Sequence, residues 1–334
     1  MAAPTDPPAA DLPPGPDPAA ATALDAPARA RRRRALAALL AVCALALAVT
    51  ALVARDDGPG RPPGAWTMRP YQGLGAWVDV YDWTEALGGP DPAVGEAEID
   101  AMAEAGVQTV FLQTAHHRVP GTVAEPERLE GLIDRAHDRG LHVVAWYLPT
   151  LVDLDADLDR LLASAALDVD GLGVDIESVE VADPAERTAR VLELTERLRA
   201  EVGDRPLSAI TLTAVHLDVV NPDFWPGYPW AELGRAYDVI QPMTYWSLRR
   251  GELRSGERYV DENLARIRAL VGDGVPVHPI GGIADEVTED DLDGMLAAVA
   301  RHGAIGGGLY DWATAEPAHW ERLGPLRALR PAAP

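Results

Sequence analysis

From Tyr71 onward, the chain alternates between short apolar segments and longer amphipathic ones. Segments with the character of buried strands occur at 73–83, 107–114, 142–149, 171–178, 207–214, 237–246, 275–283 and 303–312. Helical patterns occur at 93–106, 126–140, 155–166, 184–203, 260–274 and 288–303, and the crossover at 222–236 is the least helical. Eight strand–helix units in about 260 residues predict an α/β fold, a (β/α)8 TIM barrel. A doubly wound sheet would also alternate, but it would need fewer strands or a second domain.

The region before the barrel has a different composition. Residues 1–34 are rich in Pro, Ala and Asp and end in a basic cluster, which predicts a disordered cytoplasmic tail. Residues 35–54 form an uncharged apolar run of 20 residues, long enough for a transmembrane helix with its N-terminus inside. A cleaved signal peptide and a secreted product are the alternative, and both interpretations place the rest of the chain outside the cytoplasm. Residues 55–70 are expected to be a Pro- and Gly-rich linker to the barrel domain, 71–334.

The charge and the rare residue types exclude several classes of function. The net charge is -23, so the chain lacks the basic character that a nucleic-acid-binding protein needs. A single cysteine, Cys43, excludes an internal disulfide framework. His117, His216 and His278 lie on separate segments without a metal-ligand spacing, so we expect no metal site and no cofactor.

Polar residues gather at the C-terminal ends of the predicted strands, where barrel enzymes have their active sites. They are Asp79, Asp82, Gln113, Asp175, Glu177, Thr213, His216, Gln241, Tyr245, His278 and Asp311. The opposite ends are mostly Gly, Ala and Val. This asymmetry indicates a functional site at one end of the barrel.

The segment "DGLGVDIES", 170–178, contains the most informative pair of polar residues. Residues two apart on a strand share a face, so Asp175 and Glu177 point the same way. Two carboxyl groups confined together cannot both ionise freely, and the one whose pKa rises could protonate a glycosidic oxygen. The alternative is a structural pair that binds neighbouring loops or an Arg, because ion-pair networks also perturb carboxyl groups.

The same segment resembles the fourth-strand signature of glycoside hydrolase family 18, the chitinase family. In the pattern D-x-x-D-x-D-x-E, Asp170 matches the first Asp, Asp175 the last Asp and Glu177 the general acid. The segment "QPMTYW" is similar to the family's strand six, with Met243 and Tyr245 on its Met and Tyr. The segment "GGGLYDW" resembles strand eight, whose Trp forms the floor of the sugar site, which would be Trp312.

This resemblance implies a glycosidase that acts on an N-acetylated polysaccharide, such as peptidoglycan or a chitin-like polymer, by a substrate-assisted retaining mechanism. It implies that Glu177 protonates the leaving oxygen, that Asp175 orients the acetamido group and that Tyr245 donates a hydrogen bond to its oxygen. The residues that we expect to bind substrate are Asp79, Gln113, Trp146, Gln241, Met243, Trp246, Tyr310, Asp311 and Trp312. The membrane is the other expected partner.

Two positions depart from the family pattern. Gly173 replaces the middle Asp of the signature, and Trp246 replaces the Asp that usually follows the Tyr. Without a carboxyl at 173 to share a proton, Asp175 is expected to stay ionised and to keep Glu177 protonated by repulsion. The departures leave two other functions open, which are a catalytically silent barrel that binds glycan and a lysozyme-like hydrolase with a direct carboxylate mechanism.

Overall fold

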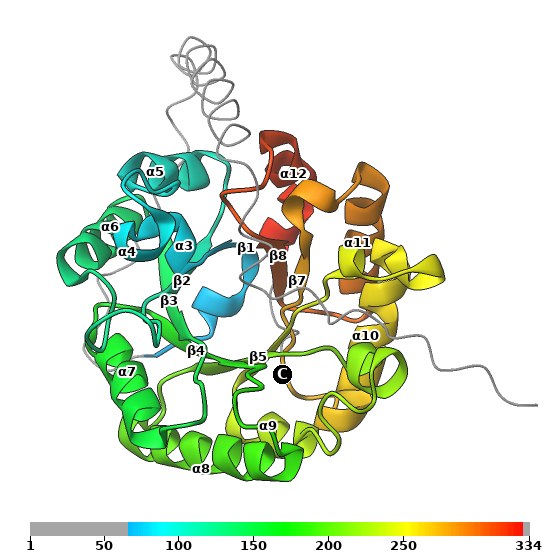
Figure 1. Cartoon of the computed structure of the whole chain (residues 1–334). Helices are drawn as coiled ribbons and strands as arrows, with labels where there is room; N and C mark the ends of the chain where they lie inside the picture. The colour runs from blue at the N-terminus through cyan, green and yellow to red at the C-terminus, as the bar shows by residue number, and fades with distance from the viewer. Residues whose placement is uncertain (1–65, 330–334) are drawn as a thin grey trace, which may run out of the picture. The chain divides into compact units, whose positions relative to one another are not determined.

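Eight parallel strands form a ring that is surrounded by helices, in a computed structural model that describes residues 66–329 (Figure 1). The strands are β1 Gly73–Val78, β2 Thr109–Gln113, β3 His142–Tyr147, β4 Gly171–Ile176, β5 Leu207–Thr211, β6 Val239–Pro242, β7 Ile280–Ile283 and β8 Gly306–Tyr310. Their order, β6-β5-β4-β3-β2-β1-β8-β7, follows the chain around the ring. Parallel bridges from Ile240 to Val277 and from Met243 to Ile280 join its two edges. The predicted (β/α)8 barrel is confirmed.

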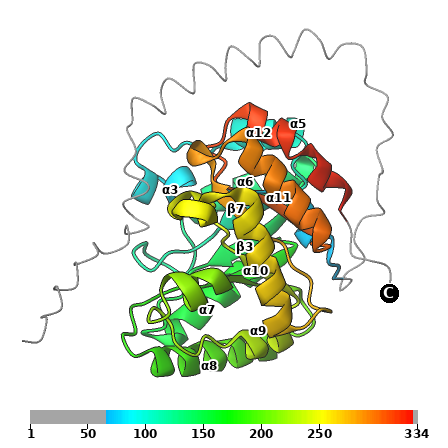
Figure 2. The same ribbon diagram turned by 90° about the vertical axis from the view of Figure 1, so that its right-hand side faces the viewer.

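Helices cover the outside of the ring (Figure 1). They are α3 Val80–Trp83, α4 Glu85–Gly88, α5 Glu96–Glu104, α6 Pro126–Asp138, α7 Leu154–Ala166, α8 Pro184–Val202, α9 Trp230–Ala236, α10 Gly256–Val271, α11 Glu289–Arg301 and α12 Pro317–Arg322. Asp183 caps the first turn of α8, and Gly203 at φ 58° ends it. Helices α10 and α11 lie side by side (Figure 2).

The first strand is shorter than the sequence pattern suggests. The apolar run at 73–83 predicts a strand throughout, but β1 ends at Val78 and α3 begins at Val80. The Asp79 side chain accepts a hydrogen bond from the Tyr81 N–H, and the Asp82 side chain accepts one from the Asp79 N–H. This reciprocal cap favours a helix start over a longer strand.

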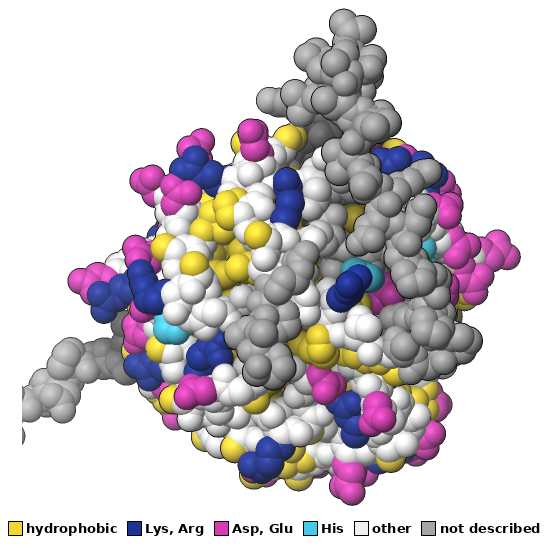
Figure 3. Space-filling view, turned by 180° about the vertical axis from the view of Figure 1, so that it is seen from behind, with side chains coloured by type: hydrophobic (Ala, Val, Ile, Leu, Met, Phe, Trp, Pro, Cys, Tyr) yellow, Lys and Arg dark blue, Asp and Glu magenta, His cyan; other side chains and the backbone are white. Residues whose placement is uncertain are grey.

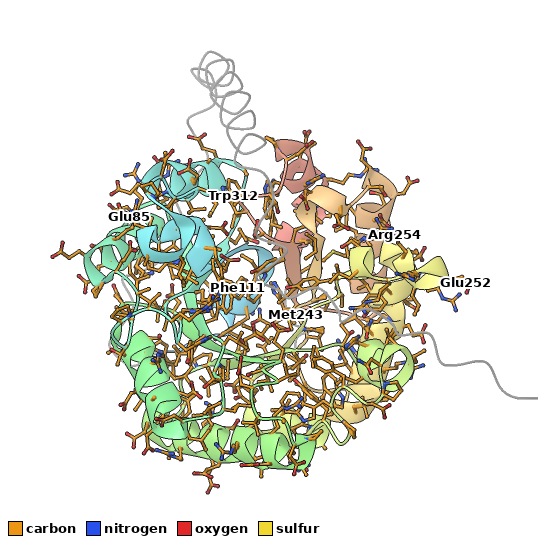
Figure 4. The ribbon with its side chains drawn as sticks, viewed as in Figure 1. Glu85, Phe111, Met243, Glu252, Arg254 and Trp312 are labelled. Carbon is orange, nitrogen blue, oxygen red and sulfur yellow. The ribbon has the colours of Figure 1, made fainter. Side chains whose placement is uncertain are left out.

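Buried apolar side chains form two separate clusters. The outer cluster lies between the strands and the helices, and it contains Leu172, Val174 and Ile176 of β4. The inner cluster fills the barrel, and its members are Tyr71, Trp77, Phe111, Val144, Trp146, Ile210, Val239, Met243, Ile280 and Ile305. Figure 4 labels Phe111 and Met243 near the centre of the ring. The barrel is therefore a packed core, and a ligand can only be bound above it.

Tyr71 closes the N-terminal end of the barrel. It ends a short 3-10 helix, Arg69–Tyr71, and its side chain is fully buried. Its hydroxyl lies 2.9 Å from the carbonyl oxygens of Leu172 and Pro206, and it accepts a hydrogen bond from the Leu172 N–H. A Cβ atom on Gly171 would lie 2.3 Å from this hydroxyl, so the start of β4 requires glycine. The expected linker thus ends earlier than residue 70, because Arg69 and Pro70 belong to this helix.

The expected tail, transmembrane helix and first part of the linker lie outside the described residues. Within 66–329, no helix combines the length and the hydropathy needed to cross a membrane. Basic and acidic side chains are interspersed on the face of the domain shown in Figure 3. Within residues 66–329, Arg135 pairs with Asp100 and Arg197 with Asp155. Where described residues are visible in Figure 3, basic side chains stand among acidic ones and form no continuous patch of the kind that binds nucleic acid.

Candidate active site

The alternation of β4 places the two carboxyl groups at the open end of the barrel. Gly171 and Gly173 face inward, because a Cβ atom on either would meet side chains of the inner cluster. By the same parity, Asp175 points inward near the end of the strand, and Glu177 follows directly after it, partly exposed. Asp170 precedes β4 at the opposite end, where its carboxylate accepts a hydrogen bond from the Val143 N–H at 2.8 Å. The first Asp of the signature therefore supports the fold.

The pair holds protons more tightly than ordinary carboxyl groups do. Burial raises the pKa of Asp175 well above its usual range, and the neighbouring Glu177 carboxylate raises it further. Burial also raises the pKa of Glu177, to about 7. Asp175 Oδ1 has no hydrogen-bond partner among the described residues, and nothing there offsets the cost of a buried charge. The direction of this shift is opposite to the one that would keep Asp175 ionised, because burial favours the neutral form of a carboxyl group.

The position of the missing carboxyl is closed by apolar side chains. A Cβ atom on Gly173 would lie 3.1 Å from Ile210 Cδ1, 3.1 Å from Ser208 Oγ and 3.2 Å from Trp146 Cβ. These contacts are tight, so there is little room for a larger side chain. Asp175 therefore lies above an apolar floor, which explains the direction of its pKa shift.

Three predicted site residues lie on β6 or directly after it and face the interior of the barrel. Met243 belongs to the inner cluster, and Tyr245 packs against it and is partly exposed. Burial raises the pKa of Tyr245, and the charges of Glu177 and Asp175 raise it further, so its hydroxyl keeps its proton. Gln241 is fully buried, and neither of its amide atoms has a partner within residues 66–329. The charges of both carboxyl groups thus act on the Tyr245 hydroxyl.

Strand β8 presents a tyrosine to the barrel interior in place of the expected tryptophan. Tyr310 packs against the inner cluster, and its ring lies 5.7 Å from that of Tyr245, centroid to centroid. Trp312 packs against the outer cluster and stacks on Trp320 at 5.0 Å. Figure 4 labels Trp312 nearer the rim of the ring than Phe111. The structure therefore does not place Trp312 at the floor of the site, and Tyr310 occupies that position.

The other aromatic residues near the site also divide between the inner and the outer cluster. Trp146 belongs to the inner cluster, and its indole N–H donates to the Phe111 carbonyl oxygen at 3.1 Å. The Trp77 ring stacks on the Phe111 ring, with 4.4 Å between the ring centroids. Trp246 is fully buried in the outer cluster, where its ring lies close to Gly282. Trp146 can therefore form part of a floor below a ligand, whereas a ligand would not reach Trp246 in this structure.

Three aspartates lie together at the ends of β1 and β8. Carboxylate oxygens of Asp79, Asp82 and Asp311 lie within 4.8 Å of one another, and all three residues are buried. Asp79 and Asp82 cap α3, and Asp311 Oδ1 accepts hydrogen bonds from the Thr314 N–H and hydroxyl at 2.9 Å. Gln113 supports this group, because its Oε1 accepts from the Val80 N–H at 3.1 Å. These hydrogen bonds give the aspartates a role in local folding, and we assign no metal to them.

Tyr228 is a site residue that the sequence patterns did not identify. It comes from the fifth crossover, and its hydroxyl donates to the Ile176 carbonyl oxygen at 2.9 Å. This bond holds the end of β4 between the two carboxyl residues. Burial raises the pKa of Tyr228, and Asp175 contributes to the shift. The concentration of aromatic residues at 224–230 is the signal that could have indicated it.

The site thus combines one carboxyl group that titrates near neutrality, a second buried carboxyl group and a tyrosine hydroxyl above an aromatic floor. A carboxylic acid that is still protonated near pH 7 can donate a proton to a leaving oxygen. Flat aromatic faces beside polar groups suit sugar rings. The arrangement can therefore perform acid catalysis on a carbohydrate.

Comparison with known proteins gives no sequence match but a clear structural one. No protein-family model matches the sequence, and no curated protein sequence matches it either. A chitinase from Chromobacterium violaceum aligns with a TM-score of 0.53 at 13% identity, over 78% of this chain and 100% of that one. The spore cortex-lytic enzyme SleL of Bacillus cereus aligns with a TM-score of 0.58 at 9% identity, over 77% and 74% of the two chains.

A third solved structure belongs to the family that the motifs resemble. The glycoside hydrolase family 18 N-acetylglucosaminidase of Paenibacillus barengoltzii aligns with a TM-score of 0.51 at 13% identity, over 76% of this chain and 99% of that one. At such identities the likeness concerns the fold alone. At the level of the fold, the resemblance inferred from the strand motifs is confirmed, because the chain has a (β/α)8 barrel like those of these glycoside hydrolases.

Proposed function

We propose that the protein is a glycosidase that hydrolyses an N-acetylated polysaccharide, peptidoglycan or a chitin-like polymer. One observation carries the proposal. Glu177 is partly exposed at the open end of the barrel and has a pKa of about 7, which suits a general acid. The names of the structural neighbours support the substrate class, since they include a chitinase, an N-acetylglucosaminidase and a spore cortex-lytic enzyme.

The proposed mechanism uses three groups of this chain. Glu177 donates its proton to the leaving glycosidic oxygen. Tyr245 donates a hydrogen bond to the acetamido oxygen of the substrate, which attacks the anomeric carbon of its own sugar. Asp175 accepts the acetamido N–H, an interaction that strengthens as positive charge grows on that group. Trp146 and Tyr310 form the apolar floor below the sugar.

The direct test is hydrolysis of N-acetylglucosamine oligomers and of purified peptidoglycan by the full chain. Cleavage of either supports the proposal. Binding of both without cleavage would favour the silent glycan-binding barrel, to which the apolar closure around Gly173 also points. Cleavage of oligomers that lack the acetamido group would favour the direct carboxylate mechanism, because a substrate-assisted reaction needs that group.

The pH dependence of hydrolysis should follow the ionisation of Glu177. The acid form is required, and its pKa is raised to about 7, so kcat should be high below pH 7 and fall above it. Measuring kcat against pH 4 to 9 with saturating oligomer checks this. A profile that is still rising at pH 9 would exclude Glu177 as the proton donor.

We also propose that the barrel is held outside the cytoplasm by residues 35–54. The motivation is the uncharged 20-residue run that follows the arginines of 29–34. A reporter fused to the C-terminus should be active only outside the cytoplasm and should sediment with membranes. Release of a soluble product with a shortened N-terminus would show instead that this segment is a cleaved signal.

A further inference from the structure

Asp79 joins two segments that are 231 residues apart in the sequence. It is buried at the end of β1, with 3% of its surface exposed. Its Oδ1 accepts a hydrogen bond from the Tyr81 N–H at 2.7 Å. Its Oδ2 accepts one from the Tyr310 hydroxyl at 2.6 Å, across the separation of 231 residues. The carboxyl group therefore connects the start of α3 to the end of β8.

The backbone around Asp79 is itself held in place. The Val80 N–H donates to Gln113 Oε1 at 3.1 Å, which ties this turn to the end of β2. The Trp83 indole N–H donates to the Gln113 carbonyl oxygen at 2.9 Å, so the same residue fixes both ends of α3. Asp79 is consequently a rigid acceptor and not a mobile surface carboxylate.

Tyr310 passes this constraint on to the catalytic centre. Its ring packs against the inner cluster and against the ring of Tyr245, 5.7 Å away and inclined by 48°. Tyr245 in turn is close enough to Glu177 and Asp175 for both charges to act on its hydroxyl. Direct contacts therefore run from Asp79 through Tyr310 to Tyr245, and the charges of the carboxyl pair act on the Tyr245 hydroxyl.

We propose that Asp79 is a positioning residue, which holds the Tyr310 hydroxyl and thereby sets the orientation of the Tyr245 ring beside the reacting acetamido group. The proposal rests on the proposed glycosidase function. It also explains how the site keeps an ordered tyrosine although the signature's carboxyl groups at 173 and 246 are Gly and Trp here. A short hydrogen bond to a buried carboxyl oxygen fixes the direction of its donor, which ring packing alone does not.

The test is a double-mutant cycle on the full chain with Asp79→Asn and Tyr310→Phe. Asn keeps an acceptor for the Tyr81 N–H and is a good helix cap, so α3 should remain folded. Each single change should lower kcat on N-acetylglucosamine oligomers by about 10- to 100-fold, as expected when a buried hydrogen-bonding group loses its partner, with a smaller rise in KM. The double variant should be no slower than the slower single one, because one bond is lost in each case.

Asp183→Asn is the matched control. Asp183 also caps a helix, by accepting from the Ala185 N–H at 2.9 Å, but it lies at the exposed start of α8. Its kcat should equal that of the unmodified protein. Additive losses in the double variant, or a normal kcat in Asp79→Asn, would overturn the positioning role while leaving the glycosidase proposal intact.

The double-mutant cycle can also be measured on oligomer binding, which needs no turnover. If the unmodified protein binds oligomers but does not cleave them, the glycosidase proposal fails and the positioning role is tested on the dissociation constant. Asp79→Asn and Tyr310→Phe should then weaken binding to a similar, non-additive extent in calorimetric titrations. Unchanged binding in both variants would overturn the positioning role as well.

Discussion

Replacement of Glu177 by Gln is expected to lower kcat by about 10²- to 10⁴-fold on oligomers with a poor leaving group. Gln has nearly the same shape as Glu but cannot donate a proton to the leaving oxygen, so KM should change little. The comparison requires kcat and KM for the two proteins on the same substrate. A smaller loss is expected on an activated aryl leaving group, because such a group leaves without protonation.

Glu180→Gln is the control for this substitution. Glu180 lies three residues further along the same loop and is exposed. It should therefore lose neither activity nor binding. Full activity in Glu177→Gln, or an equal loss in both variants, would contradict the assignment of Glu177 as the acid.

The Glu177→Gln variant should also differ from the unmodified protein in its Tm, and this difference does not depend on activity. The pKa of Glu177 in the folded protein is raised above its unfolded value, so ionisation destabilises the folded state as the pH rises toward about 7. Gln cannot ionise. Glu177→Gln should therefore have a higher Tm than the unmodified protein at pH 8, and the difference should disappear near pH 4.

Gly173→Asp is expected to destabilise the protein by about 3 kcal/mol or more, from overpacking together with a buried carboxyl group. The new Cβ would lie within 3.2 Å of Ile210, Ser208 and Trp146 side-chain atoms, so these neighbours would have to move to admit the new side chain. For a domain of this size, the loss corresponds to a fall in Tm of roughly 6–12 °C. Restoring the family's carboxyl should therefore not restore a family-like site.

The Gly173→Ala variant separates the effect of overpacking from the effect of the buried carboxyl group. It introduces the same Cβ contacts without a carboxyl group, so it should cost roughly 1 kcal/mol, which denaturant unfolding can resolve. The difference between the two variants measures the cost of burying the carboxyl. A Gly173→Asp protein that is as stable as the unmodified chain and hydrolyses oligomers faster would show that the site accepts the missing group.

The number and order of the strands could be predicted because they depend on local patterns. Each buried strand is a short apolar run, and the amphipathic segments between them have a helical period. The apolar pattern did not predict that β1 ends at Val78, because the reciprocal cap between Asp79 and Asp82 outweighs the apolar character of Val80 and Trp83. Hydrogen-bonding side chains decided that boundary, whereas hydropathy did not indicate it.

The tyrosine at the floor of the site could have been predicted from parity. Gly306 and Gly308 are four and two residues before Tyr310 on β8, so these three share a face and Trp312 lies beyond the strand. Matching the motif by residue type selected Trp312 instead. Trp246 differs from Tyr245 for another reason, because β6 ends at Pro242 and Trp246 begins a 3-10 helix, Trp246–Leu248.

The raised pKa of Asp175 could not be predicted from the sequence. Its pKa depends on what surrounds it, and the apolar floor around Gly173 comes from Trp146 on β3 and Ile210 on β5. These residues are far from Asp175 in the sequence, and only the closure of the barrel brings them together. An isolated motif can therefore identify the carboxyl groups without indicating their charge state.

The buried Tyr71 has a mechanical consequence for a chain anchored through its N-terminus. A pull on the polypeptide before Trp66 would reach the barrel through Tyr71, whose hydroxyl is bonded to the backbone at Leu172 and Pro206. The force would thus enter where β4 and β5 begin, at the end of the barrel opposite Glu177. A load on that side of the domain would therefore be borne by the closed end, away from the residues at the open end.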